Sequence, residues 1–298
     1  MSAPSATLRE PAGATLREAA LAQRVEIEAR YSQVFRVNVA RRAETIAVIA
    51  AVSGVYVYAL ATLDISWGAV FSGIGRLGQF AVLMLPPNFG TLEKLSHYME
   101  GLAQTLAIAF LGTLLAAILA LPFGFLAARN VIPNIFAHFA VRRVLDTLRA
   151  IDTLIWALIW INVVGLGPFA GILAIMTSDF GAFGKLFSEA VEATDSKAVE
   201  GIVSTGGGRL HSVRFGLLPQ VLPVFLSQVL YFFESNTRSA TIIGIVGAGG
   251  IGASLYEEIQ VNEWQRVAFL VLMILITVAL IDLVSTRLRS AIIGRRAT

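Results

Sequence analysis

The sequence contains no cysteine, only three histidines and few charged residues for its length. Of 298 residues, 14% are Asp, Glu, Lys or Arg, against roughly a quarter in soluble globular domains. The absence of cysteine excludes disulfides, thiolate nucleophiles and cysteine metal sites. His97, His138 and His211 lie far apart in different predicted loops, so no metal site is predicted.

The scarcity of charge is matched by an abundance of apolar residues. Hydrophobic residues make up 56% of the chain, and the mean hydropathy is +0.73. A soluble domain of this length needs a more polar exterior, whereas a protein surrounded by hydrocarbon does not. The net charge of +3 does not indicate nucleic-acid binding, because the basic residues flank apolar stretches instead of gathering on one polar element.

Six apolar stretches are long enough to predict membrane spans. They cover residues 45–63, 101–128, 149–164, 168–187, 220–243 and 264–284. Backbone polar groups inside a bilayer must pair within their own segment, so we expect an all-α integral membrane fold with six transmembrane helices. Residues 64–97 are interrupted by Arg76 and by Pro86-Pro87, and we expect them to lie at the extracytoplasmic interface.

The basic residues predict the orientation. With the N-terminus inside, residues 1–43 hold seven Lys or Arg, and 127–149, 185–214 and 287–298 hold four each, which is 19 of 23. This asymmetry places both termini on the cytoplasmic side of the membrane, which we expect to be a bacterial inner membrane. The predicted organisation is a polar tail (1–43), a first span with an interfacial segment (44–97), a core (98–286) and a basic tail (287–298).

The most informative segment within the core is the charged loop 189–218. From Glu200 it reads EGIVSTGGGRLHSVRFGLLPQVLP. We expect two short helices joined by a turn at 206–208, because glycine permits the positive φ of such a corner. The apolar side chains of Val199, Ile202 and Val203 follow helical spacing, which is typical of a surface that docks into a partner's cleft. An ordinary solvated loop is the alternative.

This loop resembles the cytoplasmic loop of permeases in binding-protein-dependent ABC importers. That loop has the form Glu-Ala-Ala, three residues, Gly, nine residues, Ile, one residue, Leu-Pro. Glu200, Gly206 and Leu218-Pro219 match in type and spacing, while Gly201, Ile202 and Gly216 depart from the pattern. The resemblance implies that these residues, with Arg209, couple the permease to an ATPase.

Two further segments are similar to the phosphonate-importer branch of these permeases. They are LRAIDTLIWALIWINVVGLGPF at 148–169 and YFFESNTRSATIIGIVGAGGIG at 231–252. The similarity covers roughly residues 101–284. Asp152 departs from it, because a proline is expected after Ile151. An acidic group there is expected to affect either the start of the helix or local gating.

Charged residues within the predicted spans are candidates for the substrate path. Glu234, Asn236 and Arg238 lie in the fifth span, and ionised groups at membrane depth face protein or water. Glu234 and Arg238 are four residues apart, so they form either a structural ion pair or a path lining in which Arg238 favours an anion. Asp179 in the fourth span raises the same alternatives.

Two sequence patterns need separate interpretation. Residues 247–252 match G-x-G-x-x-G, but both flanks are membrane spans, so Gly247, Gly249 and Gly250 indicate close helix packing or a bend beside the path. No phosphate-binding Walker loop occurs, so ATP and Mg²⁺ are expected only on a partner. Glu257-Glu258 is interpreted as a solvated face, because adjacent helical residues do not face each other.

The resemblance implies a non-enzymatic permease that moves phosphonate, phosphate or phosphite by alternating access. The partners implied are a second copy of the chain, cytoplasmic ABC ATPase subunits, an extracytoplasmic solute-binding protein and the lipid bilayer, with no nucleic acid. Alternatives are an importer for another small solute such as an amino acid, an ATP-independent transporter or channel, and an integral-membrane enzyme.

Overall fold

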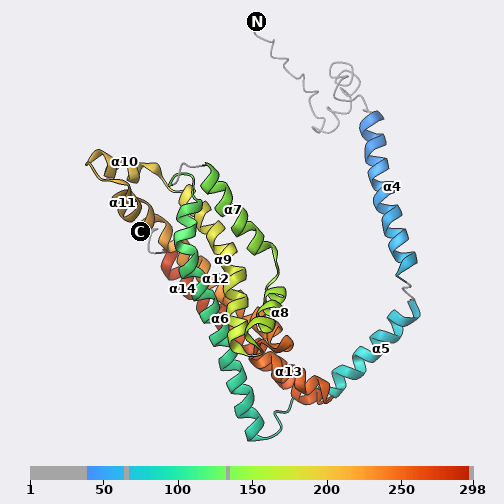
Figure 1. The fold of residues 1–298 in the computed structure, drawn as a ribbon. Helices are drawn as coiled ribbons and strands as arrows, with labels where there is room; N and C mark the ends of the chain where they lie inside the picture. Colours follow the sequence, from blue (N-terminus) through green and yellow to red (C-terminus); the bar gives the residue numbers. More distant parts are fainter. Residues whose placement is uncertain (1–38, 64–66, 132–134, 295–298) are drawn as a thin grey trace, which may run out of the picture. The chain divides into compact units, whose positions relative to one another are not determined.

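A computed structural model describes residues 39–63, 67–131 and 135–294, and within these ranges every regular element is a helix (Figure 1). Most of the expected polar tail and the last four residues lie outside the described residues. The chain divides into two compact units, Met1–Arg76 and Leu77–Thr298.

In the first unit, α4 (Val39–Thr62) confirms the first predicted span. Its side chains are almost all exposed from Arg42 onward, as expected of a helix whose apolar surface meets lipid. The segment after α4, predicted to lie at the interface, contains α5 (Trp67–Leu83), a 17-residue helix that continues through Arg76 and is not among the described helices that are long and apolar enough to cross a membrane. The prolines at 86 and 87 interrupt the chain only after α5 has ended.

The second unit is built on α6 (Leu92–Ala127) and α9 (Pro168–Glu192), which pack along much of their length. The close approach depends on small residues: a Cβ on Gly112 of α6 would lie 2.8 Å from the Ile175 Cβ of α9. The second predicted span, 101–128, is correct at its end, because α6 stops at Ala127, but wrong at its start. The helix begins at Leu92, where Thr91 Oγ1 accepts from Lys94 N, and Pro122 lies inside it.

The predicted third span, 149–164, falls on the second helix of a bent pair. α7 (Ile135–Ala150) and α8 (Thr153–Val164) meet at 90°. Asp152 explains the break, because its carboxylate accepts a hydrogen bond from Leu154 N at 2.8 Å and caps the start of α8. The acidic departure from the expected proline therefore fixes a helix start.

The remaining elements lie at the two ends of the second unit. α10 (Ser196–Ser204), α11 (Arg209–His211) and a π-helical stretch (Ser212–Leu217) form one end, from which α12 (Leu218–Ile243) runs to the other. There, a second π-helical stretch (Gly244–Ala248) leads to α13 (Ile251–Gln260). α14 (Trp264–Gly294) then returns along α12. Figure 1 shows α10 and α13 at opposite ends, called here the α10 end and the α13 end.

Among the described residues, five helices are long and apolar enough to cross a membrane, and α7 with α8 supplies a sixth if the bent pair counts as one span. The helical membrane fold predicted from the sequence is confirmed. Its interior contains apolar clusters between α6, α9 and α12, in which Phe183, Phe187 and Phe225 stack edge to face.

Candidate functional site

The predicted coupling loop forms a helical elbow at the α10 end. α10 is capped by Asp195, whose carboxylate accepts from Lys197 N at 3.0 Å, and the chain reverses at Gly206 with φ +85°. The expected arrangement of two short helices around the glycine turn is confirmed. Glu200 is exposed on α10 and accepts from Ser196 Oγ at 2.9 Å, while Arg209 is exposed at the start of α11.

The apolar side of the elbow differs from the prediction. Val199 and Ile202 turn inward, and a Cβ on Gly216 would lie 3.2 Å from Val199 Cγ2 and 3.3 Å from Ile202 Cδ1. Of the three predicted docking residues, only Val203 is exposed, with 57% of its surface accessible; Leu210 on α11 and Phe215 on the π-helical stretch are also exposed. Ile202 and Gly216, which both depart from the expected loop pattern, therefore lie close together. Isoleucine at 202 is larger than the expected alanine, and it occupies space that glycine at 216, smaller than the expected isoleucine, leaves open.

A second group of candidate residues forms a buried polar cluster among α6, α9 and α12. Asn236 Nδ2 donates to the Asp179 carboxylate and, at 2.7 Å, to Thr113 Oγ1. All three side chains are at most 5% exposed. Asp179 and Asn236 were predicted as candidates in two different spans, and the structure brings them into contact. Their burial means that the cluster joins three helices and does not line an open surface.

The third group contains Glu234 and Arg238 on α12 together with Arg289 on α14, which was predicted to lie in the basic tail. Glu234 is nearly buried, and its Oε1 lies 3.6 Å from Arg238 NH1. Its Oε2 lies 3.3 Å from NH2 of Arg289 on α14. The predicted pair is therefore a triad of two guanidinium groups and one carboxylate. Arg289 was missed because it follows the apolar run of the last span, where arginine is common.

The glycines at 247–252 form a packed corner between α12 and α13. Gly247, Gly249 and Gly250 all have positive φ. Gly247 O accepts from Gly167 N at 2.9 Å, and Ile251 N donates to Thr105 Oγ1 at 2.8 Å. These contacts tie the corner to the start of α9 and to α6, which favours the close-packing interpretation over a free bend.

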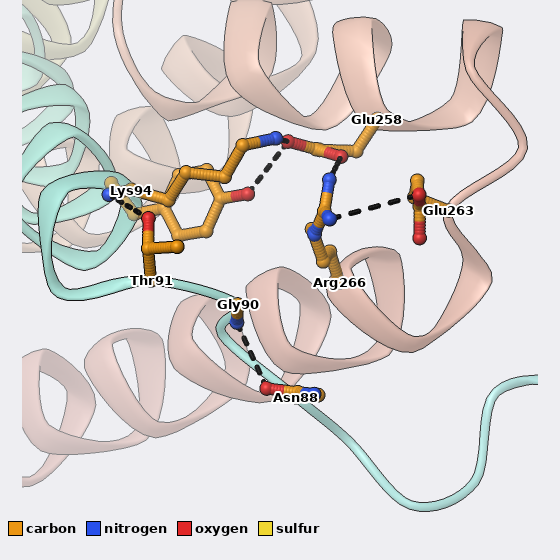
Figure 2. Close-up of polar contacts among 8 residues, drawn as sticks. Asn88, Gly90, Thr91, Lys94, Glu258, Glu263 and Arg266 are labelled. Carbon is orange, nitrogen blue, oxygen red and sulfur yellow. Dashed lines mark hydrogen bonds and ion pairs between the residues drawn. The ribbon is translucent and has the colours of Figure 1, made fainter.

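A further polar cluster at the α13 end was not predicted (Figure 2). Glu258 on α13 is 5% exposed, so its assignment to a solvated face is wrong, whereas Glu257 is exposed. Glu258 accepts hydrogen bonds from Lys94 Nζ at 2.5 Å, from the Tyr98 hydroxyl at 2.7 Å and from Arg266 NH1 at 3.1 Å. Adjacent residues point in different directions on a helix, so one of the two glutamates can be buried alone.

Electrostatics make this cluster a fastening point for α13. Burial raises the pKa of Glu258, but the hydrogen bonds from Lys94, Tyr98 and Arg266 outweigh burial and hold that pKa below its usual value. Lys94 and Tyr98 belong to α6 and Arg266 to α14, so one carboxylate joins three helices. With the glycine corner at its other end, α13 is held at both ends.

The sequence of this chain is similar to those of known transport proteins. The family model described as binding-protein-dependent transport system inner membrane component matches residues 120–297. HtxC of Stutzerimonas stutzeri, named as a phosphite transport system permease protein, is 36% identical over 92% of this chain and 95% of its own. PhnE2 of Escherichia coli (strain K12), named as a cryptic phosphonate transport system permease protein, is 48% identical over 40% of this chain and 97% of its own.

Solved structures share the fold. A chain of the MetNI methionine ABC transporter, solved in inward-facing conformations, aligns with a TM-score of 0.60 at 21% identity, covering 68% of this chain and 99% of its own. At this identity the likeness concerns the arrangement of helices.

Proposed function

The chain belongs to the family of binding-protein-dependent transport system inner membrane components, and on this premise we propose that it is the permease of an ABC importer for phosphorus oxyanions. The substrate class is phosphonate, phosphite or phosphate. The observation that carries the proposal is the combination of the helical elbow at 195–219 with 36% identity to a phosphite permease over nearly the whole chain.

The α10 end is proposed to face the cytoplasm, where an ATPase subunit receives the elbow. Exposed Val203, Leu210 and Phe215 supply an apolar surface, and Glu200 and Arg209 add charge beside it. Leu218 and Pro219 begin α12, so a displacement of the elbow passes directly into a membrane-spanning helix. ATP and Mg²⁺ are proposed to bind on the ATPase subunit, not on this chain.

The α13 end is proposed to face a solute-binding protein outside the membrane. Two copies of the chain enclose the path, because one copy supplies only half of a wall. Arg238, half exposed on α12, is proposed to face this path, and the corner at 247–250 shapes its outer part. Closure of the ATPases draws the two elbows together and opens the path outward, and hydrolysis restores the inward state.

The test is ATP-dependent uptake of phosphate, phosphite and methylphosphonate by the full chain, co-expressed with its ATPase and binding protein and reconstituted in liposomes. We expect uptake with ATP and none with a non-hydrolysable analogue. Uptake without nucleotide would indicate a secondary transporter, and uptake of amino acids instead would overturn the substrate class.

A matched pair of glycine variants tests the elbow. Gly206→Ala places a side chain at φ +85°, which costs about 1 kcal/mol and distorts the turn. Gly208→Ala is the control, because its φ is −79° and no atom lies within 4 Å of the added Cβ. We expect Gly206→Ala to lower the ratio of solute moved to ATP hydrolysed, and Gly208→Ala to leave it unchanged. Equal ratios in both variants would count against coupling through this turn.

A further inference from the structure

The Glu234 triad carries more cationic than anionic charge. One carboxylate faces two guanidinium groups, Arg238 from its own helix and Arg289 from α14. No other ion pair of Arg238 or Arg289 is formed within the described ranges. The triad therefore keeps one net positive charge between two membrane-spanning helices, where unpaired charge is costly.

The two arginines are not fully hydrogen-bonded in this arrangement. Arg289 NH2 donates to Glu234 and to Ser285 Oγ, each at 3.3 Å, but its Nε is buried without a partner. The guanidinium of Arg238 donates no hydrogen bond to any described residue, and its side chain is 50% exposed. The donors of Arg238 are open to solvent, and one buried donor of Arg289 has no acceptor among the described residues, so both arginines can take a further acceptor.

The geometry shows what kind of acceptor fits. The Glu234 carboxylate is itself an oxyanion, and it meets one guanidinium at each oxygen. A tetrahedral phosphorus oxyanion presents the same paired oxygens with equal or greater charge, and guanidinium binds such groups in a bidentate manner. Because Arg238 is half exposed, it can turn toward a solute while Arg289 stays anchored on Ser285 and over the ring of Tyr231, 5.8 Å from its centroid.

The triad lies within the length of both helices that carry it. Glu234 and Arg238 are 16 and 20 residues into α12, which begins at the α10 end. Arg289 is 25 residues into α14, which begins at the α13 end. A half-exposed arginine here faces water or protein in preference to lipid tails.

We propose that Arg238 and Arg289 form an anion-binding station for the transported phosphorus oxyanion between α12 and α14, and that Glu234 is its built-in competitor. This proposal rests on the proposed function. In the empty station the carboxylate holds both arginines. An arriving oxyanion displaces it, and the return of Glu234 promotes release, since transport requires a site that binds weakly enough to empty.

The first experiment measures equilibrium binding of radiolabelled phosphate to the detergent-solubilised complex without binding protein. We expect Glu234→Gln to bind at least fivefold more tightly than the unmodified complex, and Arg289→Gln to lose binding. Arg287→Gln is the matched control, because Arg287 is an exposed arginine two positions earlier on α14 with no ion pair among the described residues. A purely structural triad predicts no tightening in Glu234→Gln, and that result would overturn the station.

The second experiment measures uptake of phosphate and methylphosphonate by the full complex in liposomes. Arg238→Gln and Arg289→Gln should lower uptake at least tenfold while ATP hydrolysis, stimulated by the loaded binding protein, stays within about twofold. If Arg289→Gln fails to assemble, Arg289→Lys keeps the charge without the bidentate fork and should show a smaller loss of uptake. Equal loss of uptake, assembly and ATP hydrolysis in both variants would make the triad a structural clamp and refute the station.

A lipid headgroup carries the same phosphate group as the transported solute. The lipid composition of the bilayer distinguishes binding of a headgroup from binding of the solute. The loss in Arg289→Gln should be the same in zwitterionic bilayers and in bilayers with anionic lipid. A loss confined to anionic bilayers would assign Arg289 to a lipid headgroup and overturn the proposal. If the unmodified complex moves no phosphorus oxyanion, the proposed function itself fails; if it does and the variants match it, only the station fails.

Discussion

The cluster around Glu258 makes a quantitative prediction about how firmly α13 is held. Glu258→Gln keeps the shape of the side chain but removes the negative charge that Lys94 and Arg266 face. Hydrogen bonds to a charged group contribute about 1.5–3 kcal/mol each, whereas ion pairs exposed to solvent contribute about 0–1 kcal/mol. Lys94 is 40% exposed and Arg266 26%, and glutamine still accepts from one donor, so we expect a loss of about 2–3 kcal/mol.

The absence of native cysteine allows this loss to be measured locally. Ser254 is buried on α13, and Ser254→Cys introduces one thiol that a maleimide reaches only when α13 detaches. A loss of 2–3 kcal/mol raises the population of the open form roughly 30- to 150-fold, because each 1.36 kcal/mol is a factor of ten. The labelling rate of Glu258→Gln in detergent solution should rise by that factor relative to the Ser254→Cys background.

The neighbouring carboxylate supplies the control. Glu257→Gln removes the same charge from the exposed side of α13 and should leave the labelling rate within about twofold. Labelling of Glu258→Gln at the background rate, or equal acceleration of labelling in both variants, would show that the buried contacts do not hold α13.

Three further predictions follow from the same structure. Because the pKa of Glu258 is lowered in the folded protein, its contribution is complete above the ordinary carboxyl pKa of about 4.3 and is lost as pH falls through the lowered value. The labelling rate of Ser254→Cys, divided by that of the unfolded chain at the same pH to cancel the loss of thiolate, should therefore rise on acidification, and Glu258→Gln should remove that rise. Gly216→Ile should destabilise the complex by about 1–3 kcal/mol through overpacking on Val199 and Ile202, seen as a lower melting temperature. Adding Ile202→Ala should restore part of this loss, and no rescue would show that positions 202 and 216 do not share space. Asn236→Val should lower the stability of the complex by about 1–3 kcal/mol, because the buried Asp179 loses its hydrogen-bond donor. In the same melting assay, the double variant Asn236→Val with Asp179→Val should be less destabilised than Asn236→Val alone. Equal losses of stability would contradict a buried hydrogen bond between the two residues.

Features that depend on a single stretch of sequence could be predicted without a structure. Hydropathy over about 20 residues located α4, α9, α12 and α14, because a helix in lipid must be apolar along its own length. Pro168 marked the start of α9, and the glycines at 206–208 marked the turn of the elbow. Each of these follows from the local backbone preferences of the residues concerned.

Hydropathy did not locate the helix ends that are polar. α6 begins at Leu92 with a polar first turn, and α7 carries Arg142, Arg143 and Asp146, so hydropathy assigned both segments to loops. A helix needs only hydrogen bonds and a capped start, which Thr91 supplies for α6. Apolar composition therefore locates the part of a helix inside the bilayer and not its bounds.

The partners of the charged residues were decided by tertiary structure alone. Glu258 meets Lys94 across 164 positions of sequence, and Glu234 meets Arg289 across 55. Sequence shows that a charge in a membrane span needs a partner, and spacing of four residues suggests one on the same helix. Which distant side chain completes the site depends on how helices pack, because packing sets the rotation and depth of each helix against its neighbours. Local pattern therefore determined the spans and the elbow, and packing determined the arginine triad and the fastening of α13.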